Sequence, residues 1–493
     1  MKRATVLFFT LSVLILFSSH KYVPAPTAKP YNVLFIFVDD LRPDLGCYGN
    51  RIIKSPHIDA LAAQSVLFKQ QFVTVPTCGA SRASILTGLR PRSVNDLSNE
   101  AFELKPKSQN IPESFIALLR QQGYYTVGIG KISHSPDGYV YKYLEPKSSQ
   151  MELERSWDEM LFNAGKWKTG WNAFFGYADG NNRNELKGEV KPYEHAPVSD
   201  SNYPDGLTAE MAVSKLKELS TKEKPFFLGV GLFKPHLPFT APQKYWDLYQ
   251  EADISLTPSP DIPVDVNPVS LQESGEFNGY KKGEERASLA KPVSDAYARK
   301  LRHAYYAAVS YSDAQIGKIL DELKRSGKDK NTIVVLWGDH GWHLGDDRVW
   351  GKHTLSEWAL HSPLIIKVPG LPQAINNNVV SAVDVYPTLM ELCGIKKPAH
   401  IDGTSLVPAL KNPLASSAGG IAYSYFKKGI SLRTDRYRLT KYFRAAMPAI
   451  ELYDHQTDPY ENKNIAAQQP ELVKQLMVLL EKGNTGLYNK PVN

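Results

Sequence analysis

The stretch NVLFIFVDD, residues 32–40, decides the fold class of this chain. Residues Asn32 to Val38 form an unbroken apolar run rich in β-branched and aromatic side chains. Such a run is typical of a central parallel strand that is buried on both faces of a sheet. It ends abruptly in two acids, Asp39 and Asp40. The stretch therefore predicts an α/β protein with polar side chains gathered beyond the carboxyl end of a central strand.

Helical and strand-like patterns alternate along the chain that follows. We expect helices that begin at Pro56 and Pro112 and a long helix across residues 295–326. Buried strands are expected at Tyr124–Ile129, Lys224–Val230 and Thr332–Trp337. This alternation predicts a largely parallel sheet. After about residue 412 the pattern changes to short strands and a final helix, Pro470–Lys482, which predicts a smaller C-terminal α+β subdomain.

Composition excludes several classes of protein. The 493 residues are 42% hydrophobic and 22% charged, which excludes a disordered chain, a collagen-like fibre and a coiled coil. The formal net charge is +7, with no dense Lys/Arg block, so we expect no nucleic-acid partner. A mild positive excess fits an anionic small molecule or polysaccharide. Three cysteines are too few, and odd in number, for a disulfide scaffold, and the sequence leaves open whether Cys47 and Cys393 pair.

The first twenty residues have the pattern of a signal peptide. Lys2 and Arg3 precede an apolar run from Ala4 to Phe17, and small residues follow at Ser18 and Ser19. We therefore expect residues 1–20 to be removed and the protein to be exported to the periplasm or the extracellular space. The run is short for a bilayer span, and no other stretch is long and apolar enough, so we expect no stable membrane insertion, with a single-pass anchor as the alternative.

A second pair of metal-ligating residues follows a second buried strand. Asp339 and His340 come after Gly338, at the end of the strand that includes Trp337. The carboxyl ends of parallel strands meet at one edge of a sheet, so this pair should lie near Asp39 and Asp40. Carboxylates gathered in this way suggest a divalent cation, Ca²⁺ or Mg²⁺. The alternative is that these acids only cap helices or form turns.

The stretch Thr77-Cys-Gly-Ala-Ser-Arg-Ala-Ser-Ile-Leu-Thr-Gly88 is the second functional signal. A turn leading into a helix would place Cys78 at the helix N-terminus, where backbone N–H groups and the dipole favour an anion. Arg82, one turn later, would project toward the same point. For a lone cysteine, the alternative of a buried apolar side chain would be the stronger one.

These motifs, taken together, resemble those of the type I sulfatases. Cys78 to Arg82 with Leu86-Thr87-Gly88 resembles the family signature, except that Ala80 stands where most members have Pro. Four further motifs follow in the family's order: Gly123-Tyr-x-Thr126 with Gly130-Lys-x-x-His134, Lys234-Pro-His-x-Pro-Phe239, Gly338-Asp-His-Gly341 with Lys352, and Glu451-Leu-Tyr-Asp454 with Asp458-Pro459.

The resemblance implies a fold, cofactors and roles for residues. It implies an alkaline phosphatase-like large mixed sheet flanked by helices, with a catalytic domain over residues 31–410 and the C-terminal subdomain over 411–493. Cys78 would be oxidised to formylglycine by a maturation enzyme. One Ca²⁺ ion would be held by Asp39, Asp40, Cys78, Asp339 and His340. The catalytic group would be Cys78, Arg82, Lys131, His134, His236 and Lys352.

Within that family, the chain is most similar to the iduronate 2-sulfatases and other uronate 2-O-sulfatases. The stretches Asp39–Pro43 and Gly46–Gly49 carry this similarity. It implies an enzyme that removes the 2-O-sulfate of a terminal iduronic or unsaturated uronic acid in heparin, heparan, chondroitin or dermatan fragments. Matches are weak over 135–205 and 250–295, where specificity should be decided. The alternatives are a phosphodiesterase or phosphonate hydrolase of the alkaline phosphatase superfamily and a non-catalytic sulfated-glycan binder.

Overall fold

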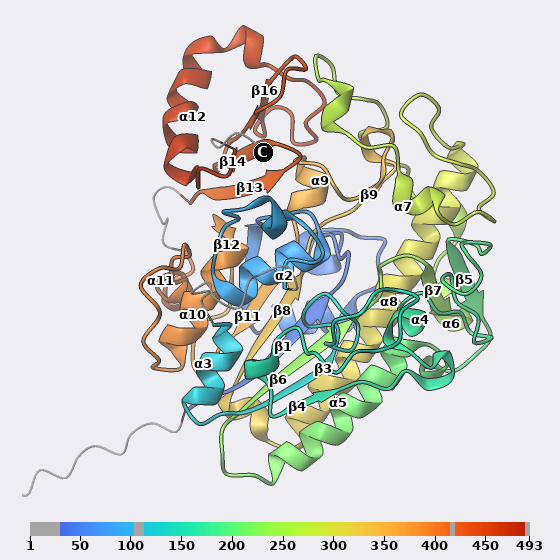
Figure 1. Ribbon diagram of the computed structural model, residues 1–493, viewed down its shortest axis with the longest axis vertical. Helices are drawn as coiled ribbons and strands as arrows, with labels where there is room; N and C mark the ends of the chain where they lie inside the picture. The colour runs from blue at the N-terminus through green and yellow to red at the C-terminus, as the bar shows by residue number, and fades with distance from the viewer. Residues whose placement is uncertain (1–29, 103–112, 415–419, 489–493) are drawn as a thin grey trace, which may run out of the picture.

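An eight-stranded sheet forms the centre of the computed structural model, which describes residues 30–102, 113–414 and 420–488 (Figure 1). Its strand order is β12-β2-β11-β8-β1-β6-β3-β4. Only β11 runs against its two neighbours in this sheet, so the predicted large, mixed and mostly parallel sheet is confirmed. The strands are β1 (Asn32–Val38), β2 (Val66–Phe72), β3 (Tyr125–Gly130), β4 (Glu159–Leu161), β6 (Phe226–Leu232), β8 (Thr332–Gly338), β11 (Leu364–Lys367) and β12 (Ala374–Ser381).

Strand β1 is the buried central strand that the sequence predicts. All seven of its residues are buried, and it pairs in parallel with β6 on one side and β8 on the other. Val38 is in register with Leu232 and with Gly338, so the three strands end at the same level. Residues that follow these strands are therefore neighbours in space.

Helices cover both faces of the sheet (Figure 1). Alternate side chains of β1 point to opposite faces: Leu34, Ile36 and Val38 share an apolar cluster with residues of α1, α5 and α8. The other set, Val33, Phe35 and Phe37, shares a cluster with residues of α2, α3 and α10. The helices are α1 (Pro56–Ala62), α2 (Cys78–Thr87), α3 (Phe115–Gln121), α5 (Pro204–Ser220), α8 (Asp295–Arg325) and α10 (Val385–Leu392). This burial on both sides explains the unbroken apolar sequence of β1.

A smaller antiparallel sheet forms the predicted C-terminal subdomain, drawn in orange and red at the top of Figure 1. Its strands are β13 (Ala422–Phe426), β14 (Gly429–Arg433), β15 (Tyr437–Tyr442) and β16 (Ile450–Asp454), and α12 (Pro470–Gly483) packs on them. Strand β13 joins it to the main domain: the Tyr425 amide donates to the carbonyl of Thr74 over 2.8 Å. The subdomain thus contacts the segment that leads into α2.

Several further expectations can be compared with the described residues. The helix expected from Pro112 begins at Phe115, where the hydroxyl of Ser114 accepts the Ala117 amide over 3.0 Å; Pro112 itself lies outside the described residues.

Cys47, Cys78 and Cys393 are free thiols, so Cys47 and Cys393 do not pair. The predicted signal peptide, residues 1–20, also lies outside the described residues. Within the described ranges, no helix combines the length and the apolar character needed to cross a membrane.

Candidate active site

The ends of four neighbouring strands supply most of the candidate site. In the order β8-β1-β6-β3, these strands are followed by Asp339-His340, Asp39-Asp40, Lys234–His236 and Lys131. The ends of β3 and β6 approach so closely that a Cβ on Gly231 would lie 2.0 Å from the carbonyl oxygen of Lys131. Only glycine permits this approach. The sheet topology thus brings together residues that are up to 300 positions apart.

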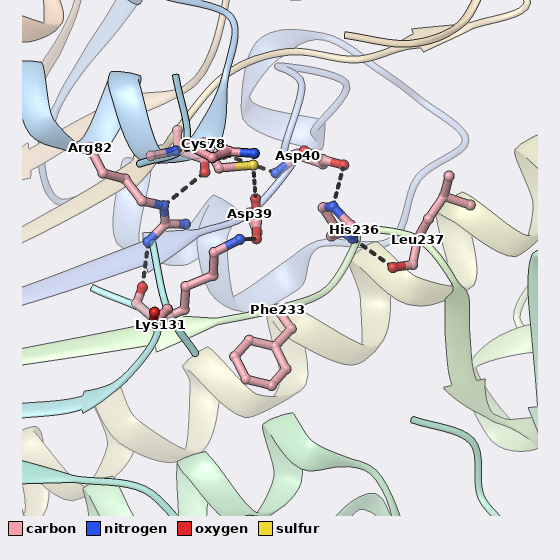
Figure 2. Close-up of polar contacts among 12 residues, drawn as sticks. Asp39, Asp40, Cys78, Arg82, Lys131, Phe233, His236 and Leu237 are labelled. Atoms are coloured by element: carbon pink, nitrogen blue, oxygen red, sulfur yellow. Dashed lines mark hydrogen bonds and ion pairs between the residues drawn. The ribbon is translucent and has the colours of Figure 1, made fainter. Parts of the chain in front are cut away.

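Cys78 is the first residue of α2 and lies at the centre of these strand ends (Figure 2). Its side chain is buried, and Sγ lies 3.2 Å from Nε2 of His340 and 3.4 Å from Oδ1 of Asp39. The Nζ atom of Lys352 lies 3.3 Å from the same sulfur. The predicted placement at a helix N-terminus is therefore found, in a group of acids, cations and imidazole rather than in an apolar core.

Each of the two lysines is paired with one of the two acids after β1. Lys131 donates to Asp39, and Lys352 donates to Oδ1 of Asp40 over 2.9 Å. Both lysines are at most 3% exposed, so neither is a solvated surface charge. Asp40 has a positive φ of 55°, which few residues other than glycine adopt. The Tyr305 hydroxyl stabilises this turn by donating to the Asp40 carbonyl over 2.7 Å.

The two neighbouring carboxylates differ in their electrostatics. Burial alone raises the pKa of Asp39, but Lys131, His236 and Arg82 more than offset it and hold that pKa well below its usual range. The pKa of Asp40 lies well above the usual range, because burial outweighs the effect of Lys352 and His340. Atom Oδ2 of Asp40 also has no hydrogen-bond partner among the described residues. Asp40 therefore has too little compensating positive charge.

Arg82 is fully buried, and three hydrogen bonds fix its guanidinium group (Figure 2). Its Nε donates to Oδ2 of Asp339 over 2.9 Å, and Nη1 donates to the carbonyls of Lys131 and Ile132. Within the described part of the chain, Nη2 has no partner. A buried guanidinium with one vacant donor beside Cys78 can bind an oxygen atom of a ligand.

The two histidines proposed from sequence occupy different sides of the site. His236 donates from Nδ1 to the carbonyl of Leu237 over 2.6 Å, and its Nε2 lies 3.8 Å from Oδ2 of Asp40. Burial and Lys352 lower the pKa of His236 to about 4. His134 packs against Trp171, with ring centroids 5.1 Å apart, and its Nδ1 has no partner in the described ranges. Burial and Lys131 lower the pKa of His134 as well.

Glu276 is part of this site, and the sequence did not point to it. Its Oε1 lies 2.9 Å from Nε2 of His236, and its Oε2 lies 3.5 Å from Nζ of Lys352. It belongs to a short helix, α7 (Gly275–Asn278), within the segment 250–295, where the sequence matches the family weakly. The hydroxyl of Ser274 fixes this helix by accepting the Trp350 amide over 2.9 Å. No local motif marks Glu276, since only the tertiary structure brings it to the site.

Comparison with known families identifies the class of this chain. The model of the sulfatase family matches residues 31–395, which include all the site residues described above. The chain belongs to the sulfatase family. It is therefore a sulfuric ester hydrolase. A second family model, described as the C-terminal part of N-sulphoglucosamine sulphohydrolase, matches residues 338–485 of this sulfatase.

Curated relatives agree with this assignment. This sulfatase is 30% identical to human iduronate 2-sulfatase over 76% of its own length and 70% of the relative's. It is 31% identical to a sulfatase of Formosa agariphila over 90% of its own length and 84% of the relative's. Among solved structures, a phosphonate monoester hydrolase of Agrobacterium radiobacter matches 92% of this chain and 96% of its own, with a TM-score of 0.71 and 22% identity. That likeness shows the shared fold only.

The donor set of this sulfatase fits a divalent cation. Ligand atoms of Asp39, Asp40, Cys78 and His340 all lie within 4.8 Å of one another. Asp339 lies beside them, with Oδ1 at 3.7 Å from Nε2 of His340 and accepting the Asp40 amide over 3.0 Å. With neutral histidines, the acids exceed the cations by one: Asp39, Asp40, Asp205, Asp339 and Glu276 face Arg82, Lys131, Lys234 and Lys352. A divalent cation would compensate Asp40 and leave one positive charge for an anionic substrate.

Proposed function

We propose that this protein is an exported sulfatase that removes the 2-O-sulfate of a terminal iduronic or unsaturated uronic acid from glycosaminoglycan fragments. One observation carries the reaction class: Cys78 lies at a helix N-terminus within 3.4 Å of Asp39, His340 and Lys352. This buried cluster combines the residue that would carry the nucleophile, side chains that can bind a metal ion, and a cation that can bind an anionic substrate. A non-catalytic glycan binder would need neither the buried acids nor the buried cysteine.

Cys78 needs modification before it can act. Burial and the charge of Asp39 raise the pKa of the Cys78 thiol to about 12, so at neutral pH it is protonated and a poor nucleophile. We propose that a maturation enzyme oxidises it to formylglycine before folding is complete. The hydrated aldehyde supplies two hydroxyl groups on one carbon, one to attack sulfur and one to expel sulfate afterwards. Ala80, in place of the usual Pro, favours a bacterial radical-type maturation enzyme.

Five residues of this chain would hold the metal, and its identity follows from their chemistry. Asp39, Asp40 and Asp339 offer hard oxygen atoms, which favour Ca²⁺, while His340 and the modified residue 78 complete the set. The bound cation would polarise a sulfate oxygen as a Lewis acid. Lys131 and Lys352 each donate to one of these carboxylates, so both ammonium groups lie next to the atoms that would hold the cation.

Three cations would bind the sulfate group and stabilise charge on it. In the site, Lys131 pairs with Asp39 and Lys352 pairs with Asp40. Each can donate to a non-bridging sulfate oxygen as negative charge redistributes during the reaction. Arg82 would use its vacant Nη2 to hold a hydroxyl of residue 78. Because these side chains are rigidly buried, little reorganisation is needed when the charge moves.

The histidines would move the protons. His236 would protonate the leaving sugar oxygen, because a sugar alcohol is a poor leaving group without a proton. In the resting site its pKa is lowered to about 4, and the negative charge of Glu276 and of a bound sulfate ester favours its charged form. His134, whose Nδ1 is vacant, would accept the proton of the second hydroxyl.

The choice of sugar rests on relatives rather than on contacts. Human iduronate 2-sulfatase is 30% identical over 76% of this chain. We therefore propose a terminal 2-O-sulfated uronate, joined to a second sugar, as the substrate. Export to the periplasm or the extracellular space would give the enzyme access to such fragments.

Measuring the hydrolysis of a panel of substrates tests this proposal, as release of sulfate from each sulfate ester and of the alcohol from a phosphonate monoester. The panel contains a 2-O-sulfated unsaturated uronate disaccharide, 6-O-sulfated glucosamine and a phosphonate monoester. We expect the uronate to be hydrolysed with the highest kcat/KM. Preferred hydrolysis of the sulfated glucosamine would refute the position of the sulfate, and preferred hydrolysis of the phosphonate would refute the sulfatase assignment.

A further inference from the structure

A cavity of about 430 Å³ lies beside the candidate active site, in the part of the chain where the sequence matches the family weakly. We call it the Trp171 cavity. It is lined by Asn99, Glu100, His134, the segment 141–145 and Trp171. Its volume is in the range of sites that bind small molecules.

Two contacts connect the Trp171 cavity to the reactive residue. His134, proposed to act in the reaction, forms part of its lining and is 7% exposed, with Nδ1 unpartnered in the described residues. On another side, Oδ1 of Asn99 accepts the amide of Gly79, the residue after Cys78, over 3.1 Å. A Cβ on Gly79 would lie 2.3 Å from the carbonyl oxygen of Asn99, so this wall abuts the start of α2. The Trp171 cavity therefore adjoins the start of α2, one residue from Cys78.

Two consecutive apolar side chains are exposed on the segment that lines the cavity. Tyr143 is 43% exposed and Leu144 is 74% exposed. Tyr143 packs against Trp171 edge-on, with ring centroids 4.7 Å apart. These adjacent apolar groups offer a ligand in the cavity apolar area to cover.

Hydrogen bonds within the protein hold this segment in place. The Tyr141 hydroxyl donates to Asp137 over 3.0 Å, and the Trp171 indole donates to the Tyr141 carbonyl over 2.8 Å. Tyr141 and Trp171 are both buried. The aromatic wall is therefore preformed, which reduces the entropy lost when a ligand binds.

The charged groups around the cavity restrict what it can hold. Glu100 and Glu145 are exposed acids in its lining, and Lys142 is an exposed cation. Carboxylates accept hydrogen bonds from sugar hydroxyls but repel a sulfate group. Aromatic rings with nearby hydrogen-bonding groups suit a ligand with one apolar face and a polar edge, such as an uncharged pyranose ring.

We propose that the Trp171 cavity binds the sugar ring next to the sulfated uronate, and that this ring lies against Tyr143 and Leu144. The inference rests on the proposed function, because it assumes that the sulfated ring lies at Cys78. It adds that the enzyme prefers a disaccharide to a monosaccharide, and that the second ring carries no sulfate.

Calorimetry on a Cys78→Ala variant tests this without any turnover. The probes are a 2-O-sulfated uronate monosaccharide, the same uronate joined to N-acetylglucosamine, and that disaccharide with a 6-O-sulfate. We expect the disaccharide without the 6-O-sulfate to bind most tightly. Adding Tyr143→Ala should weaken its binding about tenfold and change that of the monosaccharide by less than about twofold. The matched control is Tyr460→Ala in the C-terminal subdomain, since Tyr460 is 40% exposed and packs on Trp358; it should change neither affinity.

Two results would overturn the subsite. One is that the disaccharide fails to bind more tightly than the monosaccharide; the other is that Tyr143→Ala weakens both equally. Failure of the proposed function looks different, because matured enzyme would then leave the sulfate ester intact while Cys78→Ala still binds the disaccharide through Tyr143. Sulfate release together with unchanged binding in Tyr143→Ala would refute the subsite alone.

Discussion

Replacing Lys352 with methionine should reduce both turnover and the free energy of unfolding. The loss in free energy of unfolding should be larger without the metal than with it. Methionine keeps most of the side-chain volume but removes the ammonium group that lies 2.9 Å from Asp40 and 3.3 Å from Cys78. Loss of a buried donor aimed at developing charge typically lowers kcat by about 10² to 10³. Without Ca²⁺, Asp40 also loses its paired cation, and breaking a buried pair from one side costs about 3–5 kcal/mol.

The stability difference makes this prediction specific to a metal site. Bound Ca²⁺ would compensate Asp40 in place of the lysine, so the loss in free energy of unfolding should fall to about half or less of the metal-free value. Thermal unfolding of both proteins with Ca²⁺ and with a chelator measures this. The control is Lys318→Met, which removes a half-exposed ammonium group from Asp200 while Lys244 stays paired with that carboxylate; it should cost about 1 kcal/mol or less in either condition. An equal loss for Lys352→Met in both conditions would refute the metal site.

Three further changes test other parts of the site and the fold. Arg82→Lys should lower kcat/KM by about 10² or more. Lysine cannot donate to Asp339 and to two carbonyls and still keep a donor free for residue 78. Unchanged kcat/KM would contradict the proposed contact between Arg82 and residue 78. Glu276→Gln should move the basic limb of the pH profile of kcat to lower pH, since it removes the charge that raises the pKa of His236. Burial raises the pKa of Glu451 to about 7, so its contribution to stability, present below about 4.5, is lost as pH rises toward 7. Glu451→Gln should therefore raise the free energy of unfolding at pH 8 by about 3 kcal/mol or less, seen as a higher unfolding temperature than that of the parent. The same effect of the substitution at pH 5 and at pH 8 would count against this prediction.

Elements with a strong local signal could be predicted from the sequence. Strand β1 has the expected bounds, and the 31-residue helix α8 lies within the range 295–326. The acids after β1 and β8 meet because parallel strands in register end together. The position of Cys78 at the start of α2 also followed from its neighbours, Thr77 and Gly79.

Elements that depend on tertiary contacts could not be predicted. Strands β11 and β12 carry weak signals: β11 has four residues, and β12 contains three consecutive asparagines at a register shift. Helix α5 does have a local signal, a proline at its first position, that would have located it. Glu276 has none, because its place beside His236 depends on a loop that Trp350 holds.

The most direct test of the account measures the chemical state of residue 78 together with activity. A peptide mass spectrum across Thr77–Arg82 gives the fraction of aldehyde in each preparation, and sulfate release from the 2-O-sulfated uronate disaccharide gives turnover. Turnover should rise in proportion to the aldehyde fraction and should be lost when residue 78 is entirely thiol. Full turnover in protein whose Cys78 is an unmodified thiol would contradict it.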